Sequence, residues 1–255
     1  MRGSVVRYAF ITSIRDSLYL GVFAILLIAI GVSYFLGSTA LVEKHEMTLS
    51  YIAASTRIIA QAGLVLFVAF HVKRMFDNKE IDFIISRPIS RFNFILAYWL
   101  SLIFIASIII APIGLFISMI TTVNTKGLIY WTVSVFFESI IMMAFTFLAA
   151  MLLKSSTVAV LVACCFYISS RMMGFFIALD EGNLLLGGGL FYRSLYNILQ
   201  FIAVVMPRLD LFGKSEWLLY GVKNMKDILF YQIQSFVYIP LLLAISFFDI
   251  TRKDF

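Results

Sequence analysis

Charged residues are scarce in this chain of 255 residues: only 13% are charged, while 62% are hydrophobic. Soluble domains carry about 25% charged and about 45–50% apolar residues. Together with a mean hydropathy of +0.99, this composition excludes an ordinary water-soluble enzyme. Because each helical crossing of a bilayer takes about 20 residues, the chain has room for six or seven spans and none for a soluble catalytic domain.

Motifs that bind nucleotides or metals, or that carry a catalytic nucleophile, are also lacking. The sequence contains no Walker A motif, Rossmann fingerprint, His-Glu-x-x-His pair or Gly-x-Ser-x-Gly elbow. Its two cysteines, Cys164 and Cys165, are adjacent in an apolar run, so they offer neither a disulfide framework nor a metal-binding spacing. We therefore expect no catalytic residue, metal or cofactor in this chain, and any ATP hydrolysis in another subunit.

What the sequence does contain is six long apolar stretches, which predict an all-α, polytopic membrane protein. They cover residues 18–37, 58–72 with a polar lead-in from Tyr51, 93–120, 127–153, 157–178 and 228–248. We expect one domain over residues 1–255: an interfacial segment (1–17), spans one to five (18–178), an external segment (179–227), span six (228–248) and a tail (249–255). Residues 2–17 mix apolar and basic side chains, which suits an amphipathic helix on the membrane surface, although a frayed leader also fits.

Basic residues gather on one side of the predicted membrane. Eleven of the 20 Lys and Arg lie in the first segment, the loops after spans two and four, and the tail, against Lys44 and Lys126 on the two short loops opposite. Because cytoplasmic loops carry the excess of Lys and Arg, we expect both termini in the cytoplasm and the chain in the inner (plasma) membrane. The net charge of +6 thus indicates a lipid surface and not nucleic acid. Tyr130 and Trp131 are expected to anchor span four in the outer interface.

The external segment holds a further apolar run, residues 195–206, which Pro207 closes. At about 12 residues this run is too short to cross a bilayer, and such segments are typically re-entrant or interfacial. A stretch of three glycines, residues 187–189, precedes it and supplies a flexible entry. We expect the run to dip into the outer leaflet and to return to the same side.

Three ionisable residues fall inside the predicted spans: Arg57, Glu138 and Arg171. A charge at the bilayer centre costs about 2.5–3.5 kcal/mol even on the scale measured for membrane insertion. We therefore expect each of these residues to have a structural or functional role. Two interpretations stay open, namely a polar lining of a substrate path, or a buried ion pair of Glu138 with Arg57 or Arg171 that holds the bundle together. The two arginines are also close enough to the outer ends of their spans to snorkel toward the interface.

The most informative polar segment is the loop between spans two and three, which reads KRMFDNKEIDFIISRPISRFNF over residues 73–94. Its middle, residues 79–86, predicts a short amphipathic helix. Pro88 ends that helix, because the residue before a proline disfavours the helical region. Taken alone, the loop also fits a plain basic anchor on the cytoplasmic side.

Within this loop, the run ISRPISRF (residues 85–92) resembles the "LLS-x-P-I-S-R" element of the permeases of type-2 ABC exporters. Two further stretches are similar to motifs of that family: VMPRLDLF (205–212) to its "LPNLDLF"-like stretch before the last span, and FDITRKDF (248–255) to its "F-x-R-K-D/E-F" tail. Where many members carry Glu and a Gly-Thr pair before the turn, this chain has DNKEID (77–82). The six spans, the surface helix and the re-entrant run fit the same architecture.

The resemblance implies a permease subunit that forms the substrate path and works by alternating access. It implies two copies of a separate ATP-binding cassette ATPase, which would hold ATP and Mg²⁺, and a second permease copy or a homologous permease. It further implies a coupling helix in the loop, with contacts to the ATPase from Glu80, Asp82, Arg87, Pro88 and Arg91.

A stand-alone secondary carrier and a membrane-embedded enzyme remain open as alternatives. A carrier typically places charged residues at broken helices near the middle of the membrane, and here Glu138 and Pro112 are the candidates. An enzyme is expected to show paired carboxylates or histidine clusters at the membrane face, whereas the ionisable residues of this chain are scattered singly.

Overall fold

The structure is a computed structural model that describes residues 17–40, 43–78, 91–120, 123–181, 202, 206–222 and 225–252. Within these ranges the chain forms helices and turns and no strand. Six helices are long and apolar enough to cross a membrane: α2 (Ser17–Ser38), α3 (Lys44–Asp77), α5 (Arg91–Ile120), α6 (Thr125–Leu152), α7 (Ser156–Glu181) and α10 (Met225–Arg252). The prediction of an all-α, multi-pass membrane protein is confirmed at this level.

Helix α3 departs most from its predicted extent, since the apolar run covers residues 58–72 and the helix has 34 residues. Its polar residues do not end the helix because they are satisfied within the bundle. The hydroxyls of Thr48 and Thr56 donate to backbone carbonyls four residues earlier, at 2.7 and 2.5 Å. Neither hydroxyl is therefore left without a hydrogen bond in an apolar environment. At about 1.5 Å per residue, α3 is roughly 50 Å long and extends beyond the hydrocarbon core.

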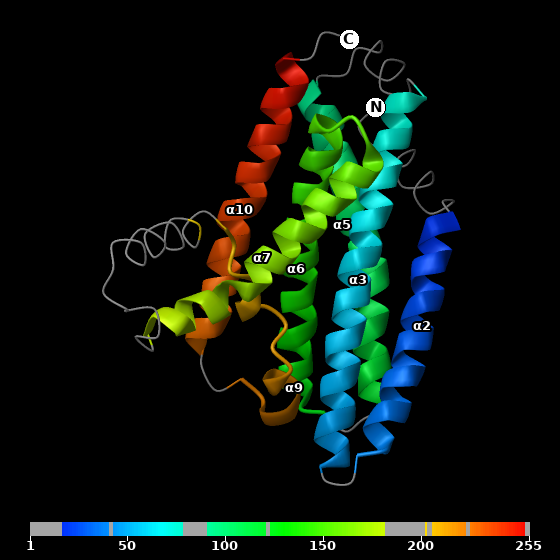
Figure 1. Cartoon of the computed structure of the whole chain (residues 1–255), viewed down its shortest axis with the longest axis vertical. Helices are drawn as coiled ribbons and strands as arrows, with labels where there is room; N and C mark the ends of the chain where they lie inside the picture. The colour runs from blue at the N-terminus through cyan, green and yellow to red at the C-terminus, as the bar shows by residue number, and fades with distance from the viewer. Residues whose placement is uncertain are drawn as a thin grey trace.

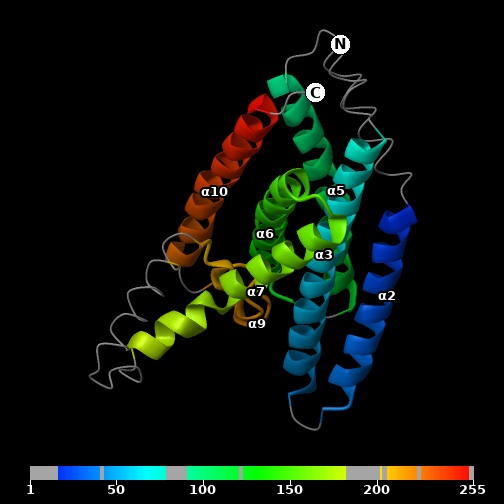
Figure 2. The same cartoon turned by 45° about the horizontal axis from the view of Figure 1, so that its top comes forward.

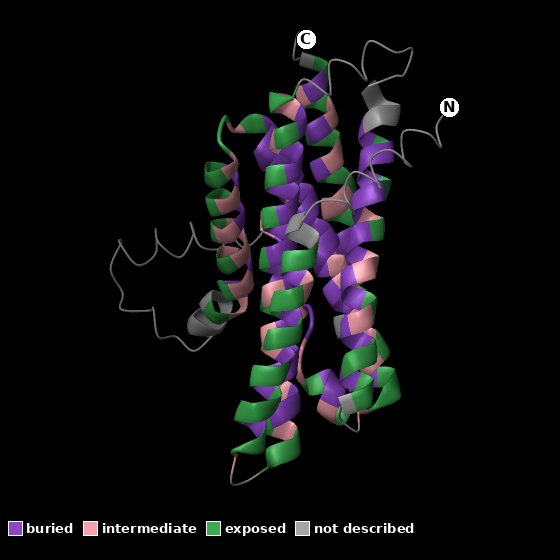
Figure 3. Cartoon of the chain, turned by 90° about the vertical axis from the view of Figure 1, so that its right-hand side faces the viewer, coloured by how far each residue is buried: buried purple, intermediate pink, exposed green. Residues whose placement is uncertain are grey.

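Helix α6 is the central element of the bundle and packs against α3, α5, α7 and α10 (Figure 1). Helix α2 lies on the outside, against α3, and α7 crosses the bundle obliquely in both views (Figure 2). Buried residues follow the inner helices, while the outward faces are exposed (Figure 3). Those faces carry large apolar side chains such as Leu20, Phe104 and Phe236, as expected of helices that contact lipid.

The ends of the helices alternate between the two ends of the bundle. The end of α3, the start of α5, the end of α6, the start of α7 and the end of α10 gather at the top of Figure 1, and the turn between α2 and α3 lies at the bottom. Four predicted features fall outside the described residues: the interfacial helix (1–16), the coupling segment (79–90), most of the re-entrant run (195–206) and the last three residues of the tail (253–255).

Two prolines lie inside spanning helices without ending them: Pro112 in α5 and Pro240 in α10. Tolerance of this kind is common in spanning helices, where neighbouring helices satisfy the backbone groups that proline frees. Helix α5 therefore continues through Pro112, so the broken helix that would favour a secondary carrier is not formed at that position.

Between α7 and α10 the chain returns toward the bundle in a stretch that we call the return segment, residues 206–222. It contains a 3-10 turn, η1 (Leu209–Leu211), and a short helix, α9 (Glu216–Tyr220). The turn packs against α7, and α9 packs against α3 and α6. Leu209 and Phe212 have no exposed surface, so the segment inserts side chains and backbone between the spanning helices.

Candidate functional site

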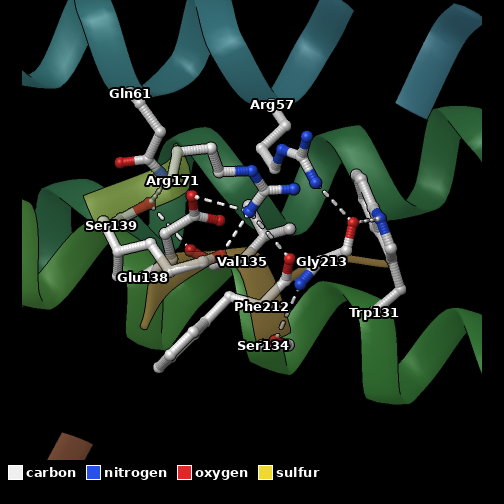
Figure 4. Close-up of polar contacts among 11 residues, drawn as sticks. Arg57, Gln61, Trp131, Ser134, Val135, Glu138, Ser139, Arg171, Phe212 and Gly213 are labelled. Carbon is white, nitrogen blue, oxygen red and sulfur yellow. Dashed lines mark hydrogen bonds and ion pairs between the residues drawn. The ribbon is translucent and has the colours of Figure 1, made fainter. Parts of the chain in front are cut away.

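The three ionisable residues that the sequence places in spans lie in one cluster, at the crossing of α3, α6 and α7 (Figure 4). Glu138 lies 13 residues after the start of α6 and 14 before its end, and its side chain is fully buried. Arg171 of α7 faces it, with 3.5 Å between Nη1 of the arginine and Oε1 of the glutamate. Arg57 of α3 is 8% exposed and lies close enough to act electrostatically on both.

Backbone carbonyl groups of the return segment accept most of the hydrogen bonds that the two arginines donate. Nη1 of Arg171 donates to the carbonyl oxygens of Leu209 and Phe212, the latter at 3.0 Å. Nη1 of Arg57 donates to the carbonyl oxygen of Gly213 at 2.5 Å. Because charge-assisted hydrogen bonds are among the strongest in proteins, the two guanidinium groups hold the turn at residues 209–213 inside the bundle.

Both backbone polar groups of Gly213 form hydrogen bonds with side chains of the spanning helices. Its N–H group donates to Oγ of Ser134 at 3.0 Å, and its carbonyl oxygen accepts from Nε1 of Trp131 at 3.2 Å as well as from Arg57. Its φ of +55° is a left-handed conformation, and a Cβ atom at this position would lie 3.0 Å from both Cδ of Arg57 and Cγ2 of Val135. Backbone conformation and space therefore both require glycine.

A second group of polar atoms surrounds Glu138. Nε2 of Gln61 donates to Oγ of Ser139 at 2.7 Å, and the Tyr167 hydroxyl interacts with the Glu138 carboxyl without reaching an ordinary hydrogen-bond geometry. In this cluster, six buried atoms have no hydrogen-bond partner among the described residues: Oε1 and Oε2 of Glu138, Nε of Arg57, Oε1 of Gln61, the hydroxyl oxygen of Tyr167 and Oγ of Ser170. Native proteins leave few such atoms, so this concentration is notable.

The formal charge of the cluster is positive, because Arg57 and Arg171 face the Glu138 carboxylate while the second carboxylate that acts on Arg171, that of Asp210, is paired with Arg208. A neighbouring pair of opposite charges, Arg208 and Asp210 at 3.0 Å, is neutral in sum. The described residues hold no group of three or more His, Cys, Asp or Glu side chains that could bind a metal ion. The arrangement can therefore bind and orient a polar group and fix the return segment.

The structure corrects one sequence-based expectation at this site. Trp131 was expected to anchor span four in the outer interface, yet it has no exposed surface. Its indole N–H has a partner in the carbonyl group of Gly213, so the ring packs inside the bundle without leaving an unsatisfied donor. Arg57 and Arg171 likewise direct hydrogen bonds into the bundle, where snorkelling would have turned them outward.

Gly213, Gln61 and Tyr167 were not singled out from the sequence. A signal for two of them was present, since Gln61 follows Arg57 by four residues and Tyr167 precedes Arg171 by four. Residues four apart share one face of a helix. Polar pairs at this spacing within an apolar span indicate an inward polar face.

The residues implied by the family resemblance lie elsewhere in the chain. Glu80, Asp82, Arg87 and Pro88 fall outside the described residues, and Arg91 is the first residue of α5, with its side chain undescribed. At the end of α3 that leads into this loop, Lys73 pairs with Asp77 at 3.5 Å.

No protein-family model matches the chain, and no curated protein matches it.

Proposed function

We propose that this chain is the permease subunit of a type-2 ABC exporter, which forms the substrate path and is driven by a separate ATPase. The observation that supports this best is the return segment directly before the sixth spanning helix. Its residues 209–212 read LDLF, part of the stretch that resembles the family, and Leu209 and Phe212 are buried against spanning helices. The re-entrant run predicted at residues 195–206 lies mostly outside the described residues, so the support comes from the LDLF stretch and its place before the last span.

Two further features support the same proposal. The run ISRPISRF (85–92) lies between α3 and α5, and the neighbouring ends of these helices are at the same end of the bundle as the end of α10 (Figure 1). In this proposal that end is cytoplasmic, because the sequence assigns 11 of the 20 basic residues to the side of the membrane that holds the loop after α3. The sequence also lacks a nucleotide-binding motif, so the energy must come from a partner.

The proposed mechanism is alternating access between two permease copies, or between this chain and a homologue, in the inner membrane. ATP binding brings the two ATPase subunits together, and they push the loops between α3 and α5. Glu80, Asp82, Arg87 and Arg91 supply charge contacts to the ATPase, and Pro88 keeps the turn stiff enough to transmit the push.

Co-purification of the chain with a Walker-type ATPase, followed by a charge reversal, tests this proposal. Glu80→Lys should lower substrate-stimulated ATPase activity several-fold while leaving membrane insertion intact, because it places like charges at the subunit contact. The matched control is Glu216→Lys, an exposed acidic residue of α9. Absence of any ATPase partner would overturn the proposal, whereas full activity of Glu80→Lys would overturn only the coupling role of that residue.

A further inference from the structure

We propose that the buried cluster at α3, α6 and α7 binds one anionic group, a carboxylate or a phosphate, of an amphipathic molecule that enters from the lipid beside α7. Arg57 and Arg171 would supply the positive charge, and Arg57 Nε with the hydroxyls of Tyr167 and Ser170 would supply the donors. That this molecule is the transported substrate rests on the proposed function, whereas the binding site itself does not.

Charge balance is the first reason. Arg57, Arg171 and Arg208 stand against two carboxylates, because Glu138 acts on the first two and Asp210 acts on Arg171 and pairs with Arg208. The cluster therefore carries one positive charge in excess. An uncompensated charge near the middle of a membrane is costly, and backbone carbonyls of residues 209–213 offset it with partial charges alone. One anionic group would make the cluster neutral.

The available donors are the second reason. Nε of Arg57 is buried and has no hydrogen-bond partner within the described part of the chain, on a residue that is 8% exposed. The Ser170 hydroxyl is buried with no hydrogen-bond partner among the described residues, and the buried Tyr167 hydroxyl has only its contact with Glu138, which falls short of hydrogen-bond geometry. On α7, Tyr167 lies three residues before Ser170 and four before Arg171, so both of these residues are its neighbours on the helix surface. Oxygens of a carboxylate or phosphate accept hydrogen bonds from all of these groups.

The position of Arg171 is the third reason, and it favours an amphipathic ligand over a free anion. The Arg171 side chain is 24% exposed, so the cluster reaches the surface of the bundle next to α7. Neighbouring residues of α7 on the outward side are apolar and well exposed: Ile168 (56%), Met172 (44%) and Phe175 (57%). A ligand whose anionic group reaches Arg171 can leave its alkyl chain in the lipid along these side chains.

Thermal protection of the purified chain in an uncharged detergent tests the site directly, because a ligand that binds the folded state raises its stability. The probes share one chain length: decyl phosphate and decanoate, with decyl maltoside and decyltrimethylammonium as neutral and cationic counterparts. Inorganic phosphate and acetate test the anion without a chain. We expect protection by the two anionic amphiphiles and little by the other four compounds.

Two variants separate ligand binding from a purely structural role of the cluster. Neither Tyr167→Phe nor Ser170→Ala removes a hydrogen bond to the return segment, so both should fold. Each should weaken the protection by decyl phosphate about fivefold to tenfold in apparent affinity, the effect of one lost hydrogen bond. Ser246→Ala, a buried serine in α10 whose hydroxyl bonds to the Leu242 carbonyl, should leave the affinity unchanged.

The possible outcomes are distinct. Equal protection by cationic and anionic amphiphiles, or wild-type affinity in both variants, would overturn the proposal and leave the cluster as a clasp for the return segment. Equal protection by inorganic phosphate would overturn the amphipathic part. If the anionic amphiphiles bind as expected but no ATPase partner is found, the site stands and the proposed function fails. If a partner is found and anionic amphiphiles neither bind nor stimulate ATP hydrolysis, only this inference fails.

Discussion

Replacement of Gly213 by alanine is the sharpest test of how the return segment is held. The glycine has a φ of +55°, and its added Cβ would lie 3.0 Å from Cδ of Arg57 and from Cγ2 of Val135. Both neighbours are in spanning helices, so neither can move far. The substitution therefore strains the turn and pushes its carbonyl group away from Arg57 and Trp131.

The size of the effect follows from two contributions. A left-handed conformation costs a residue with a Cβ about 1–2 kcal/mol, and an extra carbon in a filled interior costs about 1–3 kcal/mol. Together they predict a loss of roughly 2–5 kcal/mol in the free energy of unfolding. If the turn at residues 209–213 moves out of the bundle to relieve the strain, the arginines lose carbonyl acceptors. The decrease in the free energy of unfolding then falls in the upper part of that range.

Unfolding in a titration with a denaturing detergent, followed by tryptophan fluorescence, gives the measurement. Trp131 donates to the Gly213 carbonyl group, so one of the three tryptophans reports on the turn itself. Gly31→Ala in α2 is the matched control, since a Cβ there has nothing within 4 Å and alanine favours a helix. If Gly213→Ala unfolds within about 0.5 kcal/mol of this control, the turn is not seated as described.

Two further predictions concern the end of the bundle where α9 lies. Gly127→Ala in the first turn of α6 should destabilise the chain by about 1–3 kcal/mol in the same titration, because its Cβ would overlap the carbonyl oxygen of Trp217 at 1.8 Å; stability equal to wild type would show that α9 does not pack there. Tyr220 donates to Oε2 of Glu46 at 2.9 Å, and this hydrogen bond and the glutamate charge raise the pKa of Tyr220 above its ordinary value of 10.0. The raised pKa means that the contact stabilises the fold at neutral pH and is lost as the pH rises through the raised value. Ultraviolet difference absorbance between wild type and Tyr220→Phe should therefore show a tyrosine that ionises above pH 10.0, and a midpoint at or below this value would contradict the contact.

The spans could be predicted from the sequence because hydrocarbon imposes one simple requirement, a run of apolar residues of sufficient length. Apolar runs underestimate the length of a spanning helix where its residues are buried inside the bundle and not in lipid. The first half of α3 carries Thr48, Thr56 and Gln61, which lower its hydropathy although all three are buried. The two threonine hydroxyls bond to carbonyl groups of α3 itself, and Nε2 of Gln61 bonds to α6; a hydropathy window does not register either kind of partner.

The charged residues of the site could be predicted from the sequence, but their hydrogen-bond acceptors could not. Arg57, Glu138 and Arg171 stand out because a charge within a span is costly, so the sequence identifies the charged members. It does not identify their acceptors, because the carbonyl groups of residues 209–213 are backbone groups that every residue possesses. Likewise, an indole near the end of a span fits an interfacial anchor or a buried donor equally well, and only the position of Gly213 decides between them for Trp131.

The contacts of the return segment also set an order of assembly during synthesis. Arg57 is 156 residues ahead of its acceptor in the chain, and Arg171 is 38 residues ahead of its nearer one. When the chain inserts during synthesis, Arg57 therefore enters the membrane long before residues 209–213 leave the ribosome, and Arg171 enters shortly before them. Until then α3 and α7 carry cations without these acceptors, and a chain released before residue 213 keeps them so. Docking of the return segment is thus a late event in assembly. Only a chain that contains residues 209–213 can complete it, and a truncated chain in the membrane cannot.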